Sequence, residues 1–157
     1  MGAPEPAASS SPEAHAGAVE AVRTLARASR LIERASDELS LAHYRVLSAI
    51  GSGDERASRI ATRLAVGKPA MSAAVDALCR RGLVERLEVQ GDQRAVALHL
   101  TPAGAELLDR VETEIVRRFE TLWARTGNAD RVVDALVALG QAMDDAFADR
   151  SGAGVDR

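Results

Sequence analysis

The residues of this chain best suited to binding chemistry are basic, and they concentrate in one segment. Residues 56–94 carry eight Arg and Lys residues against four Asp and Glu, whereas the whole chain has a net charge of −3. Guanidinium and ammonium groups at this density can neutralise the phosphates of a nucleic acid. An ordinary solvated arginine-rich surface is the alternative, and charge alone does not separate the two. The eight are Arg56, Arg59, Arg63, Lys68, Arg80, Arg81, Arg86 and Arg94.

Residue types that catalyse reactions or hold metals are scattered. His15, His43 and His99 have no cysteine or carboxylate pairing beside them that would complete a metal site. The sequence has no phosphate-binding glycine loop, no HExxH motif, no nucleophile elbow and no triad pattern. Cys79, the single cysteine, is either an oxidation sensor activated by its arginine neighbours or a small residue at a helix–hairpin junction. We expect no enzymatic activity, no metal and no cofactor.

The basic segment needs a scaffold, and the residues before it predict two helices. Ser40 is a good N-cap for a helix that reaches about Ile50. Ser52 and Glu55 have the spacing of a capping box, so they predict the start of the next helix, which buries Ile60.

A tight turn and a further helix follow. Val66-Gly67 predicts the turn, with Gly67 as the residue that takes a positive φ. Pro69 suits the first turn of a helix, because its missing N–H would be unpaired there. That helix continues to Arg81, and Gly82 ends it. The result is a helix-turn-helix whose second helix is exposed on one face.

A β-hairpin is predicted directly after this pair of helices. Residues 83–89 form its first strand, 90–93 its turn, and the alternating apolar residues of 96–100 its return strand. Thr101 as N-cap and Pro102 in the first turn then open a long helix. A helix-turn-helix followed by a hairpin is a winged helix, an arrangement suited to duplex DNA.

The flanking segments complete the organisation. Amphipathic helices are predicted over about 17–38, 102–125 and 129–148, with a disordered tail at 1–16 and a frayed end at 149–157. The fold class is therefore mainly α with a small β-hairpin wing: a winged helix-turn-helix at about 40–101 plus a helical dimerisation region (17–38 and 102–148).

The flanking helices carry more apolar surface than a small central domain can cover. A symmetric homodimer is the favoured solution, and a monomer whose long helices fold back on their own core is the alternative. No apolar run approaches the roughly 20 residues that a membrane-spanning helix needs, and no secretory signal is recognisable. We expect a cytoplasmic protein.

The chain resembles the MarR family of transcriptional regulators. The wing carries the most specific part of the resemblance: Asp92-Gln93-Arg94, the alternating return strand and then Thr101-Pro102-Ala103-Gly104. Residues 41–47, 60–64 and 78–84 are similar to the second, third and fourth helices of that family. The resemblance covers about residues 17–148 in the right order.

The resemblance implies a DNA-binding dimer with interleaved terminal helices. The fourth helix would enter the major groove, and Arg94 would enter the flanking minor groove with Asp92 orienting it or its neighbours. A narrow, negative minor groove attracts an inserted guanidinium, so the physics agrees.

The fourth helix departs from the family pattern, because Ala73 stands where many members carry a basic residue. We therefore expect weak direct readout of bases and a larger share for phosphate contacts and DNA shape. Asp76 is expected to pair with a nearby arginine of the same chain. The predicted DNA-binding residues are Arg63, Lys68, Ala70, Ser72, Ala73, Arg80, Arg81, Arg86, Asp92 and Arg94.

A ligand pocket is a further expectation by analogy, since family members often bind small aromatic or phenolic effectors. Arg30, Arg34, His43, Val46 and Leu47 would face it. Ordinary helix packing with exposed arginines explains the same residues equally well.

Together these observations favour a ligand-responsive repressor that binds a near-palindromic promoter site as a homodimer. The alternative is a dimeric winged-helix module that binds proteins and has no sequence-specific affinity for DNA. The alanine-rich fourth helix keeps this alternative open.

Overall fold

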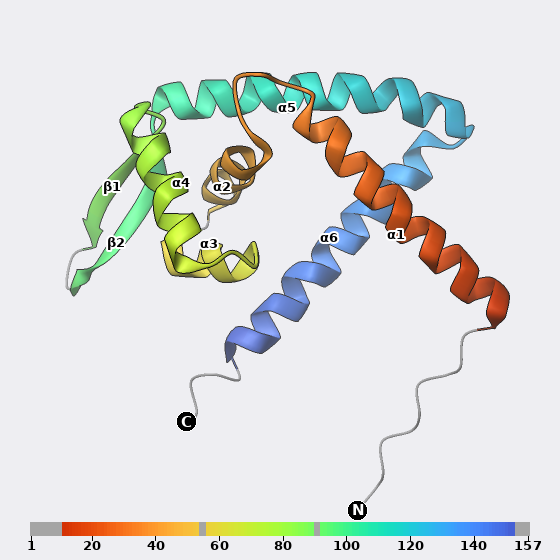
Figure 1. Cartoon of the computed structure of the whole chain (residues 1–157), viewed down its shortest axis with the longest axis horizontal. Helices are drawn as coiled ribbons and strands as arrows, with labels where there is room; N and C mark the ends of the chain where they lie inside the picture. The colour runs from red at the N-terminus through yellow and green to blue at the C-terminus, as the bar shows by residue number, and fades with distance from the viewer. Residues whose placement is uncertain (1–10, 54–55, 90–91, 153–157) are drawn as a thin grey trace, which may run out of the picture. The chain divides into compact units, whose positions relative to one another are not determined.

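The structure, a computed structural model, describes residues 11–53, 56–89 and 92–152, and all their side chains except those at 88–89, 92–96 and 150–152. It divides into two units, residues 1–34 and 35–157. We take each unit by itself (Figure 1).

The described part of the first unit is one helix, α1 (Pro12–Glu33). The hydroxyl oxygen of Ser11 accepts a hydrogen bond from the backbone N–H of Ala14 at 3.2 Å, and this cap starts the helix at Pro12. The predicted disordered tail is therefore wrong for residues 12–16, and residues 1–10 lie outside the described part. The helix also ends before the predicted Glu38.

The second unit begins with three short helices: α2 (Leu41–Gly51), α3 (Ala57–Arg63) and α4 (Lys68–Arg80). Ser40 caps α2 as predicted. The predicted capping box is wrong, because Ser52 lies at the end of α2, where its hydroxyl donates to the Ser48 carbonyl at 2.8 Å. Its predicted partner Glu55 lies outside the described residues, and α3 begins with no side-chain cap.

The wing is an antiparallel pair, β1 (Val84–Val89) and β2 (Asp92–Leu100). Glu88 pairs with Val96 and Val89 with Asp92, so residues 93–95 of β2 have no opposite residue on β1. Such a bulge bends a strand and increases its twist. The predicted turn at 90–93 is wrong for its second half, which belongs to β2.

The most deeply buried side chains of the second unit come from α2, α3, α4 and the wing. Each of them is 2% exposed or less: Leu47 of α2, Ile60 of α3, Val75 and Leu78 of α4, and Leu98 of β2. Arg56 also forms an isolated bridge to Ala97, which attaches the start of α3 to the wing. The sequence pattern did not predict this bridge.

The wing joins the next helix, α5 (Pro102–Trp123), at a tight corner. The Thr101 hydroxyl donates to the Gly82 carbonyl at 2.6 Å and accepts from the N–H of Gly104, while its backbone N–H donates to the Leu83 carbonyl. A side chain at position 104 would overlap the Leu83 carbonyl oxygen. Glycine is therefore required there for close packing.

A short 3-10 helix, η1 (Ala124–Thr126), and α6 (Ala129–Gly152) complete the chain. Gly127 takes a φ of +72° at the turn between them. Because α6 continues to Gly152, the predicted fraying is wrong for residues 149–152, and residues 153–157 lie outside the described part. None of the described helices is long and apolar enough to cross a membrane.

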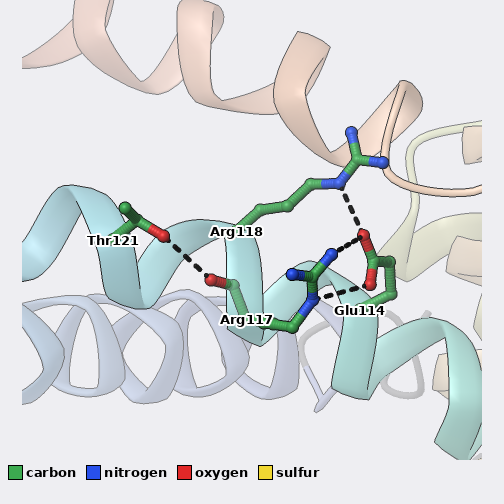
Figure 2. Close-up of polar contacts among 4 residues, drawn as sticks. All are labelled: Glu114, Arg117, Arg118 and Thr121. Atoms are coloured by element: carbon green, nitrogen blue, oxygen red, sulfur yellow. Dashed lines mark hydrogen bonds and ion pairs between the residues drawn. The ribbon is translucent and has the colours of Figure 1, made fainter.

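The helix α5 carries a compact ion cluster, which Figure 2 shows. Arg117 and Arg118 both donate to the carboxylate of Glu114, at 2.9–3.0 Å. These hydrogen bonds, with Arg117 the larger contributor, lower the pKa of Glu114 to about 2. One turn after Arg117, the Thr121 hydroxyl donates a hydrogen bond to the Arg117 backbone carbonyl.

Replacing Gly104 with alanine is expected to lower the free energy of unfolding by about 1–3 kcal/mol, because a Cβ would push α5 away from Leu83. Urea denaturation measures the change. Gly17→Ala is the matched control, since a Cβ there meets nothing within 4 Å and should gain about 1 kcal/mol of helix propensity. A Gly104→Ala protein as stable as wild type would contradict the corner geometry.

The Glu114 cluster makes stability depend on acid. A carboxyl whose pKa falls on folding contributes stability that is present above its ordinary pKa of 4.5 and is lost as the pH falls toward about 2. Glu114→Gln should remove this component, so its stability should fall less than that of wild type across the window. Thermal melts between pH 5 and pH 2 test this, with Glu120→Gln in the same helix as control; equal pH profiles for the two variants would refute it.

Candidate nucleic-acid interface

The turn between α3 and α4 sets the direction of the exposed helix. Ala65 has a φ of +52°, whereas Gly67 has a φ of −68° and serves as the N-cap of α4. The predicted positive φ at Gly67 is therefore wrong. The N–H of Val66 donates to the Ala61 carbonyl. This hydrogen bond closes the end of α3 and is typical of a helix followed by one left-handed residue, here Ala65.

The same closure recurs at the end of α4, where the sequence does supply glycine. Gly82 has a φ of +69°, and the N–H of Leu83 donates to the Leu78 carbonyl at 3.0 Å. Gly82 therefore ends the helix as predicted. Backbone hydrogen bonds therefore define the turn at each end of α4.

The exposed face of α4 is small and weakly polar. Met71, Val75 and Leu78 are buried in the core. The face turned to solvent in the first two turns carries Lys68, Pro69, Ala70, Ser72 and Ala73. This surface offers one ammonium group, one hydroxyl and several methyl groups. It is the face that the sequence predicted, and it has the shortage of base-reading side chains that the sequence predicted.

Arg86 on β1 is fixed against α4 by Asp76. Their ion pair measures 2.6 Å, and both side chains are 45% exposed. The hydrogen bond to Asp76 raises the pKa of Arg86. The expected intramolecular role of Asp76 is confirmed, and the pair joins the wing to the exposed helix.

Two other predicted phosphate contacts, Arg63 and Arg81, are also engaged within the chain. Arg63 pairs with Asp144 of α6 at 2.9 Å. Arg81 donates to the backbone carbonyl of Glu38 at 2.9 Å, while the carboxylate of Glu38 pairs with Arg110 of α5. Lys68 and Arg80 are exposed on α4.

The wing residues Asp92 and Arg94 lie in β2, and their side chains lie outside the described residues. The backbone places Arg94 within the bulge of β2, between the paired positions Asp92 and Val96. Bulges re-aim side chains relative to the strand. The role of Arg94 stays a prediction.

The predicted ligand-pocket residues have diverse environments. Val46 and Leu47 are 2% and 0% exposed and belong to the core of the second unit. His43 is half-buried; its burial lowers its pKa, and the nearby Arg81 lowers it further. Arg30 and Arg34 belong to the first unit. The pocket stays a prediction.

Among the hollows of the second unit, two border the helix-turn-helix. One cleft of about 290 Å³ lies beside α4 and the wing, lined by apolar side chains together with Lys68, Ser72 and Arg86. A second hollow of about 400 Å³ lies between α3 and the end of α6, with Arg59, Arg63 and Asp144 on its walls. Cys79 is half-buried, and the residues that the structure describes contain no cluster of three potential metal ligands.

Comparison with known proteins gives a consistent result. Residues 37–95 match the model of the MarR family. The regulator PecS of Dickeya dadantii is 31% identical over 105 residues, which are 60% of this chain and 63% of PecS. The chain spans 45–63% of the length of the curated relatives that it matches.

Solved structures agree with the fold. The repressor CouR, solved bound to a 23-mer DNA duplex, is 25% identical with a TM-score of 0.66, over 78% of this chain and 89% of that one. MarR from E. coli is 22% identical with a TM-score of 0.65, over 81% and 95% of the two chains. The second similarity shows the fold alone.

The strained turn before α4 yields a stability prediction. Ala65→Gly should raise the free energy of unfolding by about 1 kcal/mol, because a left-handed φ costs alanine roughly 1–2 kcal/mol and glycine's greater unfolded entropy offsets part of that gain. Gly82→Ala is the mirrored control and should lose about 1 kcal/mol. Urea denaturation measures both; a loss of stability in Ala65→Gly would contradict the turn geometry.

Proposed function

We propose that the chain is a member of the MarR family, whose model its residues 37–95 match, and that it binds double-stranded DNA as a homodimeric transcriptional regulator. The observation that carries the proposal is the exposed face of α4 beside a β-hairpin wing. This is the arrangement by which a protein presents one element to the major groove and a second to the adjoining groove.

We assign α4 to the major groove, with a limited role in reading bases. Ser72 can hydrogen-bond a base edge or a phosphate, and the methyl groups of Ala70 and Ala73 can contact thymine. Lys68 and Arg80 supply phosphate contacts from the same helix. Without an arginine on the first two turns, discrimination depends largely on DNA shape.

The wing supplies the second contact in this proposal. Arg94 enters the minor groove, and Asp92 orients it or its basic neighbours. Arg86, held to α4 by Asp76, faces the phosphates between the two grooves. Arg81 completes the proposed set by exchanging the Glu38 carbonyl for a phosphate. Arg63, which the sequence placed in the same set, is paired with Asp144 and is considered separately below.

A second copy of the chain is the proposed partner of the exposed apolar residues on the long helices. Their exposed fractions lie between 37% and 65%. Exposed apolar stripes of this length are covered in most soluble proteins by association, and a two-fold dimer matches a near-palindromic site. The residues are Val22, Leu25 and Leu31 of α1, Val116 and Leu122 of α5, and Val133, Leu136, Val137, Leu139 and Met143 of α6.

Such a dimer would repress transcription in the cytoplasm by occluding a promoter. A small aromatic or phenolic effector would release the dimer from DNA by binding more tightly to a conformation in which the two winged units have a different spacing. By the winged unit we mean α2 to α4 and the wing (residues 41–100). The residues proposed earlier for its pocket are Arg30, Arg34, His43, Val46 and Leu47.

A protein-binding module is the second candidate, favoured by the small side chains on α4. Fluorescence anisotropy on duplexes tiled across the region upstream of this gene, repeated at several salt concentrations, separates the two. Affinity that falls steeply with salt, with two chains per duplex, supports the regulator, because released counterions drive binding. The absence of binding to every duplex at low salt supports the module.

The wing arginine gives a residue-level prediction. Arg94→Ala should weaken binding to the preferred duplex by about 1–3 kcal/mol, because a minor-groove contact is lost while the fold is kept. Anisotropy titration measures it. Arg125→Ala serves as control, because it makes the same change in η1, outside the winged unit. Unchanged affinity in Arg94→Ala would remove the wing from the interface.

A further inference from the structure

The last turns of α6 make a specific contact with the winged unit. Phe147 is 8% exposed, and it is the only buried α6 side chain among those described. One turn earlier, the Asp144 carboxylate meets the Arg63 guanidinium, with one nitrogen at 2.9 Å and 3.1 Å from its two oxygens. Residues three apart share a helix face, so Asp144 and Phe147 approach α3 together.

The rest of α6 is different in character. Its described apolar side chains before Phe147 are exposed or half-buried, and Met143, the neighbour of Asp144, is 64% exposed. The helix α6 therefore carries two surfaces. One is the exposed apolar surface that we assign to the dimer, and the other, formed by Asp144 and Phe147 and called the anchor below, contacts the winged unit of the same chain. Figure 1 shows α6 descending from the far end of α5 toward α3.

The anchor acts close to the exposed helix α4. Arg63 is the last residue of α3, and the turn that contains Ala65 follows directly. Because that turn and the caps of α4 are fixed by backbone hydrogen bonds, a shift at Arg63 moves the start of α4. Arg63, Asp144 and Phe147 line the same hollow of about 400 Å³, so the ion pair lies where the end of α6 meets α3.

We propose that Arg63 and Asp144 are positioning residues for DNA binding: their ion pair fixes α3 and α4 against the helix that pairs with the second chain. This inference rests on the proposed function. It assigns Arg63 a role through Asp144 and not a direct phosphate contact.

The environment of Arg63 supports this assignment. Its side chain is 29% exposed, less than the 45% of Arg86. A phosphate contact would require Arg63 to leave a carboxylate that it already meets at hydrogen-bond distance, whereas Lys68 and Arg80 lie exposed on α4. Keeping the pair intact also keeps Asp144 from facing the DNA backbone as an uncompensated negative charge.

Three variants test the proposal by anisotropy on the preferred duplex. Asp144→Asn should weaken binding roughly fivefold, the upper end of what a partly exposed ion pair contributes. Asp145→Asn, the neighbouring exposed acid, removes the same charge and should instead bind as well as wild type or slightly better. Arg63→Ala should weaken binding as Asp144→Asn does, and the double change Arg63→Asp with Asp144→Arg should restore it.

The salt series distinguishes positioning from phosphate contact. A positioning residue leaves the slope of log affinity against log salt unchanged, whereas each lost phosphate contact reduces it by about one. Any one of three results would overturn the proposal. The first is a slope reduced by about one in Arg63→Ala, the second is tighter binding by Asp144→Asn than by Asp145→Asn, and the third is no recovery of binding in the charge-exchange variant. Circular dichroism confirms that each variant is folded.

The outcome for wild type separates the two proposals. Binding by wild type with equal affinities for Asp144→Asn and Asp145→Asn refutes the anchor alone. If wild type binds no duplex, the proposed function fails. The anchor is then tested by the rate of amide hydrogen exchange in the last turns of α6. Faster exchange in Asp144→Asn than in Asp145→Asn supports the contact, and equal exchange overturns it.

Discussion

The close approach of Gly104 to the carbonyl of Leu83 is the constraint on which the rest of this structure depends. At this corner the end of α4, the start of β1 and the start of α5 meet within a few residues. Thr101 fixes them by donating to the Gly82 carbonyl and capping α5 at Gly104. Only a residue without a Cβ allows this contact, so one glycine sets how the winged unit is attached to the long helix.

Electrostatics within the chain has a comparable organising role. The positive segment at 56–94 is not a free basic surface, because Arg63, Arg81 and Arg86 each hold an intramolecular acceptor. These contacts connect α6, the segment before α2 and the wing to the helix pair. Each exposed pair is worth little on its own, about 0.2–1 kcal/mol, so the group orients elements more than it stabilises them. Under the proposed function, DNA would meet a surface on which the chain's own contacts already orient these three arginines.

Local signals in the sequence were reliable where one residue type has one strong preference. Ser40 and Thr101 cap their helices, Gly82 ends α4, and Asp76 pairs with an arginine, all as predicted. The signals failed where a second partner competed. The Ser52 hydroxyl bonded to the preceding helix, so its capping box did not form.

The sequence by itself determined the order of the elements, the poverty of base-reading side chains on α4 and the amphipathic stripes of the long helices, because helix periodicity and capping act over a few neighbouring residues. Only the tertiary structure decided that Ala65, and not Gly67, takes the left-handed conformation, that Arg56 bridges to Ala97, and that Arg63 faces Asp144, eighty-one positions further along the chain. These contacts join segments distant in sequence, and their energies depend on a geometry that exists only once the core has packed.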